Sequence, residues 1–233
     1  DREVLVITPE GGILKRTPNY RTNSLQNTNA DIKLAANGNI SATLVRKSYG
    51  IQYDDKSYIE KYTQEELDEH YKSNVWNYNN NLELAKNPKF TNDKNKVEFS
   101  EEVAINIEDF ATVGPTNYIF KVNVLNRMDG IPKRYRNRKR PLKIRRAFSD
   151  KDIYNIALPD GFAIGTLPEK RKITNKFGNY QISFDKIDNN TIRYTREFSL
   201  QEGIFPKEEY KAYRKFLKSV AKLDNLRIEL IKN

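Results

Sequence analysis

Side chains able to do covalent chemistry are scarce in this sequence. Its 233 residues contain no cysteine and a single histidine, His70. Without a thiolate there is no Cys-His nucleophile, and one imidazole without cysteines cannot build a Cys/His zinc cage. His70 borders an apolar stripe, where a packed or surface role is commoner than a ligand role. We therefore expect no catalytic residue, no cofactor and no metal site in this chain.

Neighbouring carboxylates are a second route to catalysis, because two carboxylates held opposite each other can hydrolyse a glycosidic bond. Residues adjacent in sequence point to opposite faces of a strand and diverge by about 100° on a helix. Acids at a helix start also have a sufficient structural role there. We therefore disfavour carboxylate catalysis at the four adjacent acid pairs, which are Asp54-Asp55, Glu65-Glu66, Glu101-Glu102 and Glu208-Glu209.

A cluster of oxygen-bearing side chains in FDKIDNNT could bind Ca²⁺. Asp and Asn also favour hairpin turns, and the spacing of a calcium loop is absent, so a turn is the better interpretation. The cluster consists of Asp185, Asp188, Asn189 and Asn190. The sequence has no phosphate-binding loop and no dinucleotide fingerprint.

The positive charge is concentrated in one segment. The chain has 41 Lys and Arg against 31 Asp and Glu, and residues 133–146 hold nine of the basic residues and no acid. Removing those nine leaves 32 basic residues, so the rest is nearly neutral. A solvated connector with an exposed strand edge is the favoured interpretation. A surface for a polyanion or a partner domain is the alternative, with candidate residues Arg134, Arg136, Arg138, Lys139, Arg140, Arg145 and Arg146.

Composition describes a folded chain. Hydrophobic residues make up 37% and charged residues 31%, and no apolar run approaches the roughly 18 residues needed to span a bilayer. Because the sequence begins at Asp1 without a leader, we expect a processed product or a fragment of a longer protein. The lack of cysteine fits both reducing and oxidising surroundings.

Alternation of apolar and polar residues dominates the chain and predicts strands. Around Asn37-Gly38, a three-residue loop with Gly38 left-handed pairs Leu34 with Ile40 and Ile32 with Ala42, which keeps apolar side chains on one face. The turn TPEGG follows a short apolar run at residues 4–7. Further strands are expected around residues 103–107, 118–124, 142–144, 153–158, 171–174, 180–184 and 191–198.

Two helices interrupt this pattern. Thr63 and Glu66 form a capping box that predicts a short helix with Leu67, Tyr71 and Val75 on one face. The segment 206–222 has apolar residues at helical spacing, and the alternating residues 226–230 predict a last strand. We expect this helix to fold onto a sheet that the last strand joins. Residues 77–96 indicate a loop or a weak edge strand.

The expected fold is mainly β, with two β-sandwich-like units over residues 1–130 and 131–233. The first contains the short helix. The second ends with the C-terminal amphipathic helix and the final strand.

The second half carries a family resemblance. Asn137 to Phe162, KFGNYQISF, TIRYTREFSL and FPKEEYKAYRKFLKSVAKLDN resemble the C-terminal region of large exported bacterial transglutaminase-like proteins. There a β-sandwich domain of unknown function follows a papain-like core. REVLVITPEGG resembles the junction after that core. The matching residues are turn and packing residues, and the Cys, His and Asp triad of the core has no counterpart here.

The resemblance implies a non-catalytic accessory domain that supports or positions a covalently linked or adjacent transglutaminase-like domain. It also implies export, to the periplasm or the cell surface of a bacterium. We expect no nucleic acid as a partner. The alternative, a ligand-binding module for polysaccharide or another polyanion, rests on the basic segment.

Overall fold

The fold is mainly β, with 49% of residues in strands and 17% in helices. It is a computed structural model that describes residues 3–17, 24–128 and 130–232. The expected fold class, with a C-terminal helix followed by a final strand, is confirmed.

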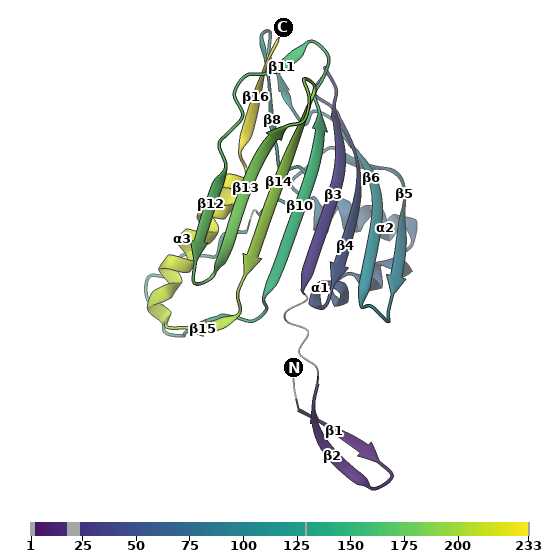
Figure 1. The fold of residues 1–233 in the computed structure, drawn as a ribbon, viewed down its shortest axis with the longest axis vertical. Coiled ribbons are helices and arrows are strands. Elements are labelled where there is room, and N and C mark those ends of the chain that lie inside the picture. The colour runs from purple at the N-terminus through teal and green to yellow at the C-terminus, as the bar shows by residue number, and fades with distance from the viewer. Residues whose placement is uncertain (1–2, 18–23, 129, 233) are drawn as a thin grey trace.

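An eight-stranded sheet forms the main layer (Figure 1), in the order β12-β13-β14-β10-β3-β4-β6-β5. Neighbours run antiparallel except β10 and β3, which are parallel. The strands are β3 (Leu25–Leu34), β4 (Ile40–Tyr49), β5 (Leu82–Asp93), β6 (Glu98–Ile107), β10 (Phe148–Ala157), β12 (Arg171–Asn175), β13 (Gly178–Lys186) and β14 (Thr191–Leu200).

Three smaller sheets complete the strand content of the described residues. A four-stranded sheet has the order β11-β16-β8-β7 and contains β7 (Thr112–Val113), β8 (Asn117–Lys121), β11 (Phe162–Ile164) and β16 (Arg227–Lys232). β9 (Leu142–Ile144) pairs with β15 (Gly203–Phe205), and β1 (Glu3–Thr8) pairs with β2 (Gly11–Arg16).

The helices lie behind the large sheet in the view of Figure 1. α1 (Ile51–Asp54), a 3₁₀ turn at Ser57–Lys61, α2 (Gln64–Glu69) and a π-helical turn at His70–Val75 follow β4. The expected capping box is present: Thr63 Oγ1 accepts from the Glu66 amide, and Glu66 accepts from the Thr63 amide at 2.8 Å. A 3₁₀ turn at Lys207–Glu209 leads into α3 (Tyr210–Asp224).

The β3–β4 hairpin has the register that the sequence predicts. Leu34 lies opposite Ile40 and Ile32 opposite Ala42, and Gly38 has a φ of 93°, a conformation that disfavours any residue with a Cβ. The buried side chains of both strands therefore share one face. Residues 82–93 form β5, an edge strand with register shifts between Leu84 and Lys89, in agreement with the expected weak edge.

One continuous hydrophobic core joins the large sheet to the elements behind it. Along β3, Ala30, Ile32 and Leu34 are buried while the residues between them are exposed. The opposite face of the large sheet, which faces the viewer in Figure 1, carries those exposed polar side chains and no covering helix or strand among the described residues. Antiparallel sheets commonly leave one face to solvent in this way.

The expected packing of the chain's end needs a correction. β16 joins the four-stranded sheet, where it pairs with β8 and β11. α3 instead contacts the eight-stranded sheet, since Phe216 packs against Phe198 of β14 with ring centroids 6.2 Å apart. The helix and the final strand thus belong to different sheets, because the chain turns away between Asp224 and Arg227.

The expected boundary at residue 130 does not interrupt the sheets. β10 from the second part pairs with β3 from the first, and β16 pairs with β8. That each part is a separate folding unit stays a prediction.

The β1–β2 hairpin lies apart from the main body in Figure 1. Its expected turn is confirmed, and Thr8 Oγ1 donates to the Gly11 carbonyl at 2.9 Å. Leu5, Ile7 and Leu14 on one face are 62%, 76% and 71% exposed. No helix in the described part of the chain is both long and apolar enough to span a bilayer.

Candidate functional site

A basic groove with a volume of about 770 Å³ opens on the surface. It lies between the segment before β9 and the first half of α3. Eight of its eleven lining residues are Lys or Arg, and one is acidic. The lining is Arg134, Tyr135, Arg136, Arg138, Lys207, Glu208, Tyr210, Lys211, Arg214, Lys215 and Lys218.

The segment on one side of the basic groove is fastened to α3. The Tyr210 hydroxyl donates to the Lys133 carbonyl at 2.6 Å, and Arg214 Nε donates to the Pro132 carbonyl at 2.8 Å. The Arg138 guanidinium stacks over the Tyr210 ring at 4.3 Å from its centroid. The segment is therefore held against the helix by specific contacts, which differs from the solvated connector favoured on sequence grounds.

The structure separates the seven basic candidates into two groups. Arg134, Arg136 and Arg138 line the basic groove. Lys139, Arg140, Arg145 and Arg146 are exposed and do not line it. Arg146 instead forms an ion pair with Asp55 at 3.0 Å, beside α1. The expected strand at residues 142–144 is present as β9.

The half of the basic groove that α3 provides was not predicted from the sequence. Lys211 pairs with Arg214 and Lys215 at spacings of three and four residues, and Lys218 stands at the same spacings from Lys215 and Arg214, so the four share one face of α3. The sequence predicted that the apolar face of this helix packs on a sheet, and no role was predicted for its basic face. The basic stripe on the opposite face of α3 was the available signal. It is far in sequence from the basic segment at residues 133–146.

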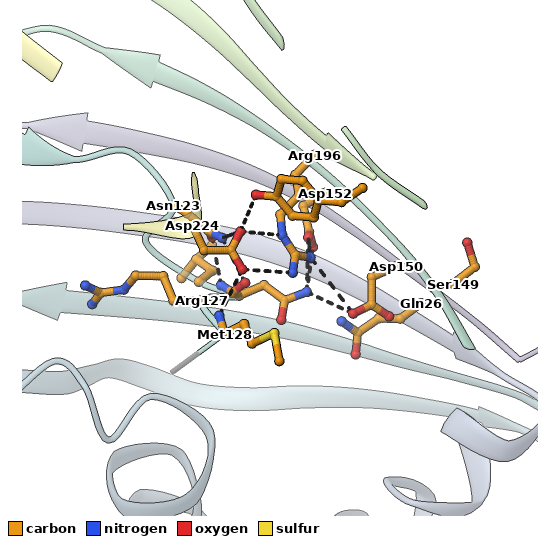
Figure 2. Close-up of polar contacts among 12 residues, drawn as sticks. Gln26, Asn123, Arg127, Met128, Ser149, Asp150, Asp152, Arg196 and Asp224 are labelled. Carbon is orange, nitrogen blue, oxygen red and sulfur yellow. Dashed lines mark hydrogen bonds and ion pairs between the residues drawn. The ribbon is translucent and has the colours of Figure 1, made fainter. Parts of the chain in front are cut away.

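A second candidate lies in the interior, where Arg196 of β14 sits between two carboxylates (Figure 2). Its guanidinium donates to both carboxylate oxygens of Asp224, Nε to Oδ1 at 2.8 Å and Nη2 to Oδ2 at 3.1 Å. Nη1 donates to Asp152 Oδ2 at 2.9 Å. The exposed fractions of these three residues are 2%, 0% and 0%. We call them, with their hydrogen-bond partners, the Arg196 cluster.

Further donors satisfy the two carboxylates of the Arg196 cluster. Asp224 accepts from the Tyr180 hydroxyl at 2.6 Å, from Asn123 Nδ2 at 3.0 Å and from the Met128 amide at 3.0 Å. Asp152 accepts from Asn126 Nδ2 at 3.0 Å. Buried charges are tolerated when they are paired and hydrogen-bonded in this way. The cluster therefore connects β10, β13, β14, the end of α3 and the segment after β8.

Burial and charge act in opposite directions on the Arg196 cluster. Burial raises the pKa of Asp152 above its usual range, and Arg196 only partly offsets this. Burial disfavours the charged guanidinium, yet Asp224 and Asp152 raise the pKa of Arg196 well above its usual value. The guanidinium stays protonated, and its three short hydrogen bonds to carboxylates fix its position.

A neighbouring polar cluster surrounds Glu101 of β6, which is 1% exposed. The Tyr71 hydroxyl donates to Glu101 Oε1 at 2.8 Å, and Lys56 Nζ lies 3.6 Å from Oε2. Lys56 also donates to Gln26 Oε1. Arg46 lies directly opposite Glu101 on β4. Burial opposes ionisation of Glu101, but Lys56, Arg46 and Tyr71 together lower its pKa.

Lys56 gives this cluster a dependence on pH. Burial lowers the pKa of Lys56 from 10.5 to about 8. Between about pH 8 and pH 10.5, Lys56 is largely neutral in the folded chain and protonated in the unfolded chain. The unfolded chain therefore binds more protons, and stability rises with pH. We expect the free energy of unfolding in urea to increase by about 2 kcal/mol between pH 7.5 and 9.5. The Lys56→Met variant should lose this increase.

Lys61→Met, which removes an exposed lysine of the same segment, serves as the matched control and should keep the increase. The comparison stays below pH 10, because buried tyrosines with raised pKa values destabilise the folded state once unfolded tyrosines ionise. One of them is Tyr78, whose pKa burial raises to about 12. An unchanged slope in Lys56→Met would show that Lys56 is not the titrating group.

Two sequence expectations about other side chains can be compared with the structure. His70 is packed, with its ring edge-on to Tyr62 and Tyr71 at centroid distances of 5.8 and 5.4 Å. Asp188 serves a turn, since its Oδ1 accepts from the Asn190 amide at 2.7 Å. The Ile187 amide donates to the Thr191 carbonyl at 3.0 Å. The turn interpretation of FDKIDNNT is therefore confirmed.

These features define a mainly β module with a buried ion cluster and an ordered basic groove. Residues 116–230 match the model of the family described as Domain of Unknown Function with solved-structure structure (DUF3858). This match begins at β8 and ends within β16, so it includes the basic groove, Asp152, Arg196 and Asp224.

Among solved structures, this chain is similar to a putative protease from Parabacteroides distasonis ATCC 8503. The likeness covers 50% of this chain with 17% sequence identity and a TM-score of 0.42. This chain spans 24% of the length of that protein. The comparison with curated proteins found no match.

Proposed function

We propose that this chain is a non-catalytic accessory unit of a larger exported bacterial protein, in which it supports or positions a transglutaminase-like catalytic domain. The observation that carries the proposal is the Arg196 cluster. Its buried charged groups, which would be the strongest candidates for chemistry, hold four elements of the fold together through hydrogen bonds. This use of charge suits a rigid support.

The uncovered face of the large sheet adds to this argument. Its polar side chains bind one another across strands: Asn155 Nδ2 donates to Asp31 Oδ1 at 2.9 Å, and Arg193 Nε donates to Asn155 Oδ1 at 3.0 Å. Lys151 and Glu197 form an ion pair at 3.4 Å. Interfaces between domains of one chain are more polar than obligate interfaces, so an ordered polar face of this kind suits contact with a linked domain.

The purified chain should have no thiol-type hydrolase or transamidase activity. The physical reason is the absence of cysteine from the sequence, since the thiolate is the attacking group in such reactions. The measurement is turnover of a fluorogenic peptide and incorporation of an amine donor into a glutamine peptide. Turnover that persists through repeated purification and follows the protein peak would contradict the proposal.

The accessory role can be tested separately, in the larger protein to which the proposal assigns this chain. A reading frame that extends upstream into a Cys-His-Asp core is the first expected finding. Deleting residues 24–233 should then lower the thermal midpoint of the catalytic core and its activity. A core with unchanged stability, activity and substrate preference after the deletion would overturn the supporting role.

A further inference from the structure

We propose that the basic groove binds a linear acidic polysaccharide through the sulfate or carboxylate groups of its sugar chain. The proposal rests on the groove's own charge, shape and order, so it stands independently of the accessory role. Three features carry it: the excess of cations, their arrangement in a row, and the contacts that hold both walls together.

Charge in the basic groove is strongly unbalanced. Eight cationic side chains line it, and the lining contains one acid, Glu208. Glu208 lies 4.0 Å from Lys207, and one carboxylate offsets a single charge of the eight. A concave surface lined by one sign of charge focuses the electrostatic field and raises the local concentration of oppositely charged ligands. The groove is therefore suited to a ligand with several negative charges.

The cations of the helical wall form a row. Lys211, Arg214, Lys215 and Lys218 lie on one face of α3 and extend about 10 Å along its axis, at about 1.5 Å per residue. Arg134, Arg136 and Arg138 provide cations on the opposite wall. A linear chain with regularly repeated charges suits this lining better than a compact anion does, because it contacts several cations at once.

Both walls are ordered before any ligand arrives. Tyr210 and Arg214 donate hydrogen bonds from α3 to the carbonyls of Lys133 and Pro132. Arg138 Nη2 donates to the Pro141 carbonyl at 3.0 Å and its guanidinium covers the Tyr210 ring. Binding to a wall that is already fixed has a smaller ordering cost than binding to a loose basic segment.

The remaining features favour a polysaccharide over nucleic acid. Single-stranded nucleic acids bind through successive bases stacked on aromatic rings. Tyr135 is the accessible ring of this lining, at 56% exposure, while Tyr210 is 8% exposed. A single accessible ring can contact one sugar face but cannot provide a stacking series.

A lipid surface is also disfavoured. Helices that bind at a membrane interface bury an apolar face among the lipids beside their basic face. The apolar face of α3 is already in the core, where Phe216 and Leu217 are each 4% exposed and Val220 is fully buried. A flat bilayer would also reach the rim of the groove more readily than its floor.

Heparin is the probe for the test, measured by calorimetry and fluorescence anisotropy at about 150 mM salt, where the Debye length is about 8 Å. The wild-type chain should bind it, and the double variant Lys211→Glu/Lys218→Glu should bind about tenfold more weakly or worse. Circular dichroism and the thermal midpoint establish that this variant is folded.

The matched control is Lys170→Glu/Lys172→Glu, which makes the same change in net charge at exposed positions outside the groove. This control should change heparin affinity by less than about twofold. No binding by the wild-type chain, or an equal loss in both double variants, would overturn the proposal. Tighter binding to oligo-dT or to vesicles containing anionic lipid than to heparin would also overturn it, and would assign the groove to another class of ligand.

Discussion

Arg196→Met should lower the free energy of unfolding by about 3 to 5 kcal/mol. Arg196 provides three charge-assisted hydrogen bonds to Asp152 and Asp224, both of which have 0% exposure. Its loss leaves two buried carboxylates without their counter-charge, and methionine cannot replace the donors. The measurement is urea unfolding of the purified chain at pH 7, with the denaturant slope compared between variant and wild type.

Arg193→Met on the same strand is the matched control. Arg193 is exposed and donates to Asn155 at 3.0 Å on the open face of the sheet. Exposed polar pairs contribute little to stability, so we expect a loss of less than about 1 kcal/mol. Similar losses in the two variants would show that the Arg196 cluster is not desolvated in solution, and would contradict its role as a rigid support.

The stability of Arg196→Met should also respond to pH through Asp152. Burial already raises the pKa of Asp152 with Arg196 present, so removing the cation raises it further. A raised carboxyl pKa means that the folded chain binds more protons than the unfolded chain, and stability then falls as pH rises through this range. The loss in free energy of unfolding of Arg196→Met relative to wild type should therefore be smaller at pH 5 than at pH 7.

Local patterns in the sequence predicted much of this fold. The register of β3 and β4 follows from apolar alternation and from Gly38, and the start of α2 follows from the reciprocal hydrogen bonds of Thr63 and Glu66. These features depend on residues within a few positions of one another. Pairing of β3 with β10 joins residues more than a hundred positions apart, and no local pattern specifies such a contact. The continuity of the sheet across residue 130 could therefore not be predicted from local sequence patterns.

The Arg196 cluster left a signal in the sequence that was not used. Alternation in β14 runs Ile192, Tyr194, Arg196, Phe198, so Arg196 occupies an inward position. Asp152 precedes Tyr154 on the inward face of β10. Charges of opposite sign at apolar positions of two strands indicate a buried pair, because an isolated buried charge is too costly. Which two strands are neighbours is the part that only the folded structure supplies.

The second large effect concerns the docking of α3. Phe216→Ala should lower the free energy of unfolding by about 3 to 5 kcal/mol, the usual range for removing a buried phenylalanine side chain. Phe216 is 4% exposed and contacts Phe198 of β14, and Leu217 and Val220 bury beside it on the same helix face. Because this face joins the helix to the sheet, the cavity left by the variant lies between two elements whose relative position the Arg196 cluster also fixes.

Lys218→Ala is the control from the opposite, exposed face of α3, and its stability should change by less than about 0.5 kcal/mol. Urea unfolding of both variants is the measurement. Small and equal effects would mean that the helix is not docked, and an exposed apolar face should then make the chain associate at high concentration.

A large loss in Phe216→Ala also bears on the basic groove, because the helix that carries Lys211 and Lys218 can hold one wall in place only while its apolar face is packed. Heparin affinity of Phe216→Ala should therefore weaken, although Phe216 itself does not line the groove.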